Sequence, residues 1–282
     1  MSAGAASGPV SVWRGAYAAV TLGAVALVFL AALQSLAVTT VMPIVSEELD
    51  GASLYAVAFA GTLATSVIGM VAAGAWADRS SPLKPLTAAV VLFVLGLIMA
   101  GAAASMPMLV AGRLIQGLGV GGQTVSLYVI VARVYPQPLH GRVFAAFSAA
   151  WVIPSLVGPF LAGAVTEYLH WRWVFLGVAG LTTAAFVVVA VRLSGRDLHT
   201  DDPAGGGTAK RLALAVLVAA SALTLSLSGE LGSWAWAGVL VSLVVMAIVI
   251  RPLLPRRALR AGRGLPSVVL MRALIAEIGR AH

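Results

Sequence analysis

Residues 74–85 read GAWADRSSPLKP, a short charged turn between two long apolar runs. Its charged residues are Asp78, Arg79 and Lys84. The runs on either side, residues 54–77 and 86–104, are each close to the ~20 residues that a helix needs to cross the hydrocarbon core of a bilayer. The turn is therefore predicted to connect two transmembrane helices outside the lipid.

The composition of the whole chain also indicates a membrane protein. Of its 282 residues, 60% are hydrophobic and 10% are charged, whereas average soluble domains carry about 25% charged residues. So few charges cannot cover a soluble globule of this length. The chain has no cysteine, which excludes disulfides and thiolate metal sites. Its net charge of +8 comes from bases between apolar runs, which favours membrane orientation over nucleic-acid binding as their role.

Eight apolar runs are long enough to be transmembrane helices. They cover residues 17–43, 54–77, 86–104, 108–130, 143–165, 173–191, 212–228 and 233–250. Continuous apolar runs argue against the ~10-residue alternating strands of a membrane barrel. The predicted class is an all-α, multi-pass membrane protein with a six-helix bundle, two further transmembrane helices and a missing second bundle.

The bases alternate between the connections. The N-terminal tail and every second connection after it are basic. Together these segments hold fourteen Lys and Arg residues, whereas the other connections hold one, Arg172. This positive-inside pattern predicts a cytoplasmic N-terminus, in the plasma (inner) membrane. The predicted segments are a cytoplasmic tail (1–16), the six-helix bundle (17–193), a cytoplasmic linker (194–211), two additional spans (212–253) and a basic cytoplasmic loop (254–264).

The last part of the sequence begins a further span. Residues 265–275 are mostly apolar, but half a span would leave backbone carbonyls without partners in lipid. We therefore expect residues 265–282 to be the start of a truncated second bundle. Residues 277–282, EIGRAH, are typical of a translated sequencing-library adapter, and we assign them no function.

The fourth span contains GRLIQGLGVGGQ, in which Arg113 is the one charge well inside a predicted span. Intramembrane charges are costly, so Arg113 is a functional candidate; the alternative is a structural arginine bound to backbone carbonyls of a neighbouring helix. Gln116 lies on the same face at i+3. Gly117 and Gly121 have GxxxG spacing, with Gly119 between them, and predict a close helix crossing.

Two other spans contain residues that are unusual in lipid. The fifth holds Pro154, Gly158, Pro159 and Gly163, and proline kinks a helix because it lacks a backbone donor. A static kink for packing and a bend used during transport are equally good interpretations of this segment.

In the first span, the polar residues Gln34, Ser35, Thr39 and Thr40 are expected to face the bundle interior. They either line a substrate path or form hydrogen bonds between helices. Trp151, in the fifth span, is either a cavity wall or a packing residue.

No catalytic pattern is present in the sequence. It has no HExxH, GxSxG or Walker motif, and its four histidines are scattered. We therefore predict neither an enzyme nor a cofactor or metal site.

The chain resembles the major facilitator superfamily in three motifs. These are the basic turn after the second span, RxxQGxG in the fourth span and the Gly-Pro pair in the fifth. Within this superfamily, the chain is similar to drug:proton antiporters of the fourteen-helix branch. The resemblance implies two six-helix bundles separated by two extra helices. It also implies a small-molecule substrate and protons as partners, with proton-coupled efflux of amphipathic compounds or drugs by alternating access.

The resemblance also implies roles for single residues. Gly74, Asp78 and Arg79 match a turn that helps to hold the two halves of such transporters in one conformation. Lys84 is the only later base there, because Ser81 and Pro82 replace the usual glycine and arginine. The aromatic pair Trp171 and Trp173, around Arg172, is expected to anchor the chain at the outer membrane interface.

In the fourth span, Arg113, Gln116, Gly117 and Gly119 match a motif whose arginine is implicated in proton coupling. Gly158, Pro159 and Gly163 match the helix motif associated with antiporters.

Gln34 stands where the fourteen-helix antiporters have an acid, and glutamine cannot titrate. A facilitator or another ion-coupled transporter is therefore the alternative within transport. A non-transporting fragment or membrane partner protein is the alternative outside it.

Overall fold

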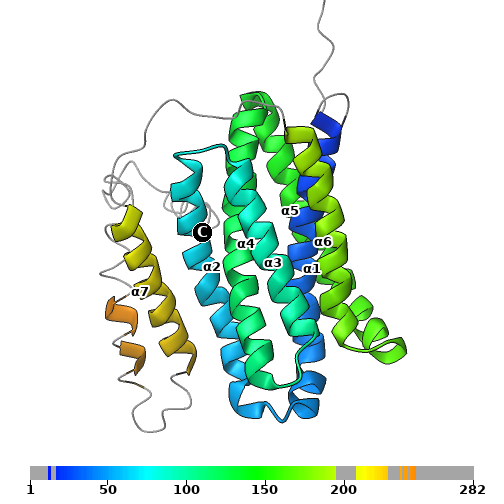
Figure 1. The fold of residues 1–282 in the computed structure, drawn as a ribbon, viewed down its shortest axis with the longest axis vertical. Coiled ribbons are helices and arrows are strands. Elements are labelled where there is room, and N and C mark those ends of the chain that lie inside the picture. Colours follow the sequence, from blue (N-terminus) through cyan, green and yellow to red (C-terminus); the bar gives the residue numbers. More distant parts are fainter. Residues whose placement is uncertain are drawn as a thin grey trace, which may run out of the picture.

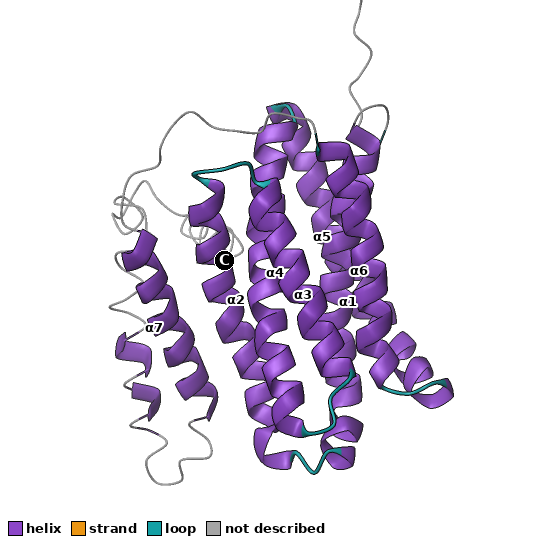
Figure 2. Cartoon of the chain, viewed as in Figure 1, coloured by secondary structure: helices purple, strands orange, loops and turns teal. Residues whose placement is uncertain are grey.

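The computed structural model describes residues 12–13, 17–194, 208–227, 236, 238–240 and 242–245. Within these ranges the regular structure is helical and no strand occurs (Figure 2). The elements are α1 (Ala18–Glu48), η2 (Ala52–Leu54), α2 (Tyr55–Ala77), α3 (Leu83–Gly101), α4 (Met106–Val134), α5 (Gln137–Tyr168), α6 (Arg172–Leu193) and α7 (Thr208–Leu227).

The first six predicted spans are confirmed as helices long and apolar enough to cross a membrane. The seventh overlaps α7, whose apolar part, Arg211–Leu225, is shorter than these six. Most of the eighth span lies outside the described residues, as do residues 1–11, 195–207 and 246–282. The predicted linker, basic loop and second-bundle start therefore stay predictions.

The helix ends differ from those expected. We expected the first helix to end at Pro43, but α1 continues through this proline to Glu48. Prolines also lie in the first turns of α4 and α5, at Pro107 and Pro138, where the missing N–H would have no helical partner. A proline thus marks the start of two helices, whereas α1 tolerates one near its end.

The six helices stand side by side as an upright bundle (Figure 1). α4 packs against α2 and α3, α1 packs against α5 and α6, and α3 packs against α6. The connections α1–α2, α3–α4 and α5–α6 lie at one end, which we call the Glu48 end. The connections α2–α3 and α4–α5 lie at the other, which we call the Arg133 end (Figure 1).

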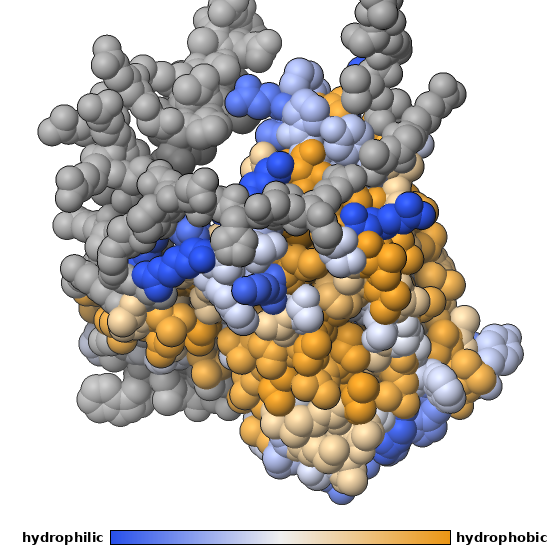
Figure 3. Space-filling model, turned by 45° about the horizontal axis from the view of Figure 1, so that its top comes forward, coloured by the Kyte–Doolittle hydropathy of each residue, from blue (hydrophilic) through white to orange (hydrophobic). Residues whose placement is uncertain are grey.

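Apolar side chains fill the bundle and also cover its flank. One buried cluster includes Val38, Phe93 and Phe175, and a second includes Leu27 and Leu127. Apolar residues spread over the outer flank, while hydrophilic residues gather towards the ends (Figure 3). A flank of this kind suits contact with lipid, which does not penalise exposed apolar side chains.

The glycines of α4 bring this helix unusually close to both of its neighbours. A Cβ on Gly117 or Gly121 would overlap backbone atoms of α2, and a Cβ on Gly119 would overlap the backbone of α3 at Phe93. Small residues allow such close backbone approach in membrane helices. α4 is thereby fixed between α2 and α3, which positions the residues on its remaining face.

Candidate functional site: a cavity beside Arg113

A cavity of about 280 Å³ is lined by residues of α1, α2, α4 and α5, together with Phe93 of α3. Its polar lining residues are Ser35, Thr39, Thr62, Ser66, Arg113, Gln116 and Thr124. Its walls also include Phe59, Met70 and Trp151. Trp151, which is 49% exposed, is thus a cavity wall rather than a packing residue. Most binding cavities combine apolar walls with a few polar groups in this way.

Arg113 is the charged residue of the cavity. It lies seven residues after the start of α4, or about 10 Å along the helix at 1.5 Å per residue, and only 4% of it is exposed. Its Nε donates to the Ala58 carbonyl oxygen of α2 (3.3 Å), and its Nη1 donates to Oε1 of Gln116 (2.8 Å). The guanidinium also lies over the Phe59 ring, 6.0 Å from its centroid.

No carboxylate neutralises this cation among the described residues. The two ion pairs there both belong to Glu48. The acidic residues of α1 to α6 lie at helix ends: Glu47, Glu48 and Glu167 in last turns and Asp78 as the C-cap of α2. Gln116 therefore contributes a neutral amide where an acid would form an ion pair.

The hydroxyl groups of the cavity use their protons within their own helices. Thr39, Thr62, Ser66 and Thr124 each donate to a carbonyl oxygen three or four residues earlier, at 2.6 to 2.9 Å. Their oxygen lone pairs remain available as acceptors. Arg113 and Gln116 are therefore donors that this surface offers to a ligand, and Arg113 is the charged one.

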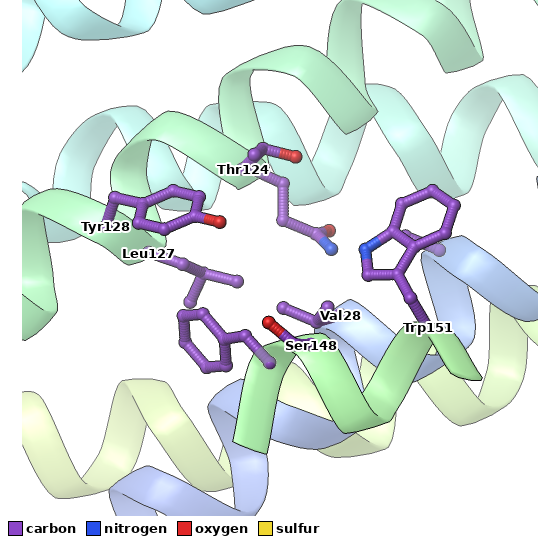
Figure 4. A pocket seen from close by; sticks show the side chains of 9 residues that line it. Val28, Thr124, Leu127, Tyr128, Ser148 and Trp151 are labelled. Carbon is purple, nitrogen blue, oxygen red and sulfur yellow. The ribbon is translucent and has the colours of Figure 1, made fainter. Parts of the chain in front are cut away.

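A smaller cavity of about 110 Å³ continues from the first along α4 and α5. The two share Ala31, Thr124 and Trp151. The Tyr128 hydroxyl, the Ser148 hydroxyl and the Trp151 indole nitrogen point towards its middle (Figure 4). The combined surface therefore runs from Arg113 past Thr124 towards the Arg133 end.

Gln34 lies on a different face of α1 from the cavity. It is fully buried, and neither its Nε2 nor its Oε1 has a hydrogen-bond partner among the described residues. Its neighbours in sequence, Ser35 and Thr39, line the cavity as one of the two sequence interpretations expected. The structure thus brings Arg113 and Gln116 together at the cavity and places Gln34 outside its lining.

The turn at residues 74–85 is held by a residue that the sequence did not single out. Arg133 of α4 donates from Nη2 to the Ala77 carbonyl oxygen (2.7 Å) and from Nη1 to that of Ser80 (3.2 Å). Asp78 and Arg79 are exposed, and their side chains form no ion pair within the described ranges. A Cβ on Gly74 would meet Val125 of α4 at an ordinary contact distance, 3.6 Å, and Lys84 is exposed.

The proline-containing segment of α5 remains one continuous helix. Pro154 and Pro159 both lie inside it. A Cβ on Gly158 would make ordinary contacts with Leu33 and Leu36 of α1, whereas a Cβ on Gly163 would meet nothing within 4 Å. Gly158 thus faces α1, and Gly163 faces open space.

The prediction that Trp171 anchors the membrane interface was wrong. Trp171 is 1% exposed, and its Nε1 donates to Oε2 of Glu48 (2.7 Å). Arg172 lies 3.6 Å from Glu48, donates to the Ala103 carbonyl oxygen (3.0 Å) and covers the Trp171 ring at 4.5 Å. These contacts join α1, α6 and the α3–α4 connection. Trp173 is 54% exposed, and its role at the interface stays a prediction.

Sequence reasoning also missed most of the cavity lining. Thr62, Ser66, Thr124 and Tyr128 belong to it but were not predicted. The available signal was their spacing, because Thr62 and Ser66, like Ser35 and Thr39, are four residues apart and so share a helix face.

These features define a multi-pass helical membrane protein with an internal cavity. The sequence-family model of the Major Facilitator Superfamily matches residues 24–276, and the chain belongs to this superfamily.

Several known proteins are similar to it. An MFS-type transporter of the acurin A biosynthesis cluster of Aspergillus aculeatus is 30% identical over 74% of this chain and 37% of its own length. The multidrug efflux pump SdrM of Staphylococcus aureus is 27% identical over 58% of this chain and 36% of its own length. The chain spans only about a quarter to somewhat over a third of the curated relatives that it matches.

Among solved structures, a bacterial homologue of the human lysosomal transporter Spinster, inward-facing and unoccupied, is similar at 15% identity. The TM-score is 0.49, and the match covers 91% of this chain and 67% of the other.

Proposed function

We propose that the protein is a secondary active transporter that exports small amphipathic compounds in exchange for protons. The cavity beside Arg113 is the observation that carries this proposal. It combines a buried cation, neutral hydroxyl acceptors and aromatic walls, which together suit a molecule with polar and apolar parts. In transporters of this kind the substrate binds near the bilayer midplane between two helical bundles that rock against each other.

Two further observations support efflux across the plasma membrane. The similarity to a multidrug efflux pump and to a transporter of a biosynthesis cluster suggests export of small molecules. The base-rich connections lie at the Arg133 end, which we propose to be cytoplasmic, with the N-terminus on the same side. The second cavity would then extend the substrate path towards the cytoplasm.

A facilitator, or a transporter coupled to another ion, is the second candidate. It is favoured by Gln34, which cannot titrate, and by the position of every acidic residue of α1 to α6 at a helix end. Under this alternative, substrate would move without any dependence on a proton gradient.

Transport by the full-length protein in liposomes separates these candidates. Fluorescent amphipathic compounds should accumulate inside the liposomes only while a pH gradient is present, and a protonophore should abolish this accumulation. Transport at the same rate with and without the gradient would reject proton antiport and support the facilitator. In that case Gln34→Asp, which supplies the missing carboxyl group, should introduce pH dependence.

The turn at residues 74–85 is proposed as a gate that helps to hold one conformation. Asp78 and Arg79 are exposed there and are free to reach a partner bundle. Asp78→Asn should slow transport without weakening substrate binding. Asp50→Asn, the same change at the Glu48 end, is the control and should change neither transport nor substrate binding. Normal transport by Asp78→Asn would reduce this turn to a signal for membrane orientation.

A further inference from the structure

We infer that the cavity selects organic anions, and that Arg113 is the contact for the acidic group of the transported compound. The inference rests on the proposed function in one respect only, namely that this cavity is the transport site. It goes further by assigning the charge of the substrate.

The first observation is the charge of the site. Arg113 is 4% exposed and lies among neutral groups, since its hydrogen-bond acceptors are Gln116 and the Ala58 carbonyl oxygen. Removing a guanidinium from water costs several kcal/mol unless an opposite charge compensates it. Within the part of the chain that the structure describes, no carboxylate does so. A ligand carboxylate in the cavity would supply the missing charge.

The second observation is the number of donors left over. A guanidinium has five N–H donors, and the two hydrogen bonds above use two of them. Because Oε1 of Gln116 accepts from Arg113, its amide nitrogen is a further donor on the same side of the cavity. Carboxylate and sulfonate oxygens accept several such bonds at once, and arginine binds them with two parallel hydrogen bonds.

The third observation is the rest of the lining. The hydroxyl groups offer acceptor lone pairs, which suit neutral N–H and O–H groups of a ligand. Phe59, Phe93 and Trp151 provide apolar surface beside them. The substrate class is therefore an amphipathic molecule with one acidic group, bound at Arg113, and an apolar body that extends past Trp151. Lipophilic cations do not suit the lining that the described residues form, because it contains the cation Arg113 and no carboxylate.

Three fluorescent compounds that differ in one group test this assignment. They are N-dansyl-6-aminohexanoate, its neutral primary amide, and N-dansyl-1,6-diaminohexane, whose free primary amine makes it a cation. Binding to the full-length protein in nanodiscs of neutral phosphatidylcholine is measured by energy transfer from tryptophan, with protein-free nanodiscs as the blank. The carboxylate should bind about ten- to hundredfold more tightly than the amide, the range expected for a charge-assisted contact. Equal binding of all three, or preference for the cation, would overturn the inference without any variant.

Variants then locate the contact. Arg113→Gln should remove the preference for the carboxylate while leaving binding of the amide unchanged, and Arg113→Lys should retain part of it. Arg192→Gln, the same change at an exposed position of α6, is the matched control and should behave as the parent protein. A carboxylate preference that persists in Arg113→Gln would also overturn the assignment.

Transport of the same compounds distinguishes the two proposals. If the cation or the amide is exported in a manner that depends on the pH gradient and the carboxylate is not, this result supports proton-coupled efflux and rejects anion selectivity. If the carboxylate binds through Arg113 but no compound is transported, this result supports the anion site and rejects the transport function.

Discussion

Two arginines of this bundle have similar neighbours but differ in charge compensation. Arg172, at the Glu48 end, donates to a backbone carbonyl oxygen, covers an aromatic ring and lies 3.6 Å from a carboxylate. Arg113, inside the bundle, also donates to a backbone carbonyl oxygen and lies over an aromatic ring, but its third partner is the neutral Gln116. The partly exposed arginine is neutralised, whereas the buried one has no carboxylate beside it among the described residues.

The difference shows which cation has a structural role. An arginine that only joined helices would be most stable with its charge compensated, as Arg172 is by Glu48. A buried charge left without such a partner, beside a cavity of about 280 Å³, costs stability and is retained at sites that bind ligands or ions. The comparison therefore supports a scaffold role for Arg172 and the proposed role of Arg113 in binding the substrate.

The largest effect is expected from the packing that positions Arg113. Gly121→Leu would force a side chain into the backbone of α2 at Ser66 and should destabilise the protein by about 3 kcal/mol or more, since backbone cannot move aside cheaply. Thermal unfolding in detergent, followed by tryptophan fluorescence, measures this. Gly163→Leu, in open space, is the control and should unfold as the parent does. Similar melting temperatures for the two variants would show that close packing of α4 is unnecessary.

A smaller effect is expected from making Arg113 resemble Arg172. Gln116→Glu places a carboxylate 2.8 Å from Nη1 of Arg113, where the amide oxygen now lies. The internal ion pair should compete with a ligand carboxylate and weaken anion binding about tenfold, or about 1.4 kcal/mol. Titration with the dansyl carboxylate measures the loss, and the neutral amide should bind as before. Undiminished carboxylate binding would show that ligand and Gln116 do not share this cation.

The smallest effect is expected from making Arg172 resemble Arg113. Glu48→Gln removes the carboxylate charge but keeps an oxygen that can accept from the Trp171 indole. Because the pair is partly exposed, the loss should be about 1 kcal/mol or less, seen as a melting temperature lower by a few degrees. Anion binding should stay constant. A change in anion affinity would mean that the two arginines are not independent.

Hydropathy predicted the bundle because membrane thickness sets helix length directly. The first six spans follow from uninterrupted apolar runs, and Arg113 stood out because no other charge lies so deep. Helix ends were less predictable: Pro43 does not stop α1, because the residues after it continue the helix to Glu48. Trp171 looked like an interfacial anchor because its hydrogen-bond partner, Glu48, is 123 residues away in the sequence.

The cavity could be predicted only in part, for a physical reason. Thr62 and Ser66 are ordinary residues of an apolar span until α4 packs against α2. The contact between Arg113 and the Ala58 carbonyl oxygen joins residues 55 positions apart. Spacing along one helix shows which residues share a face, but only packing shows which faces meet.

The most direct test of the account compares Arg113→Gln with Arg172→Gln for affinity and for stability. The account predicts that Arg113→Gln loses about ten- to hundredfold in affinity for the dansyl carboxylate without a fall in melting temperature, because an uncompensated buried charge has been removed. It predicts the reverse for Arg172→Gln, a lower melting temperature with unchanged affinity. Equal losses of carboxylate affinity in the two variants, or none in Arg113→Gln, would contradict it.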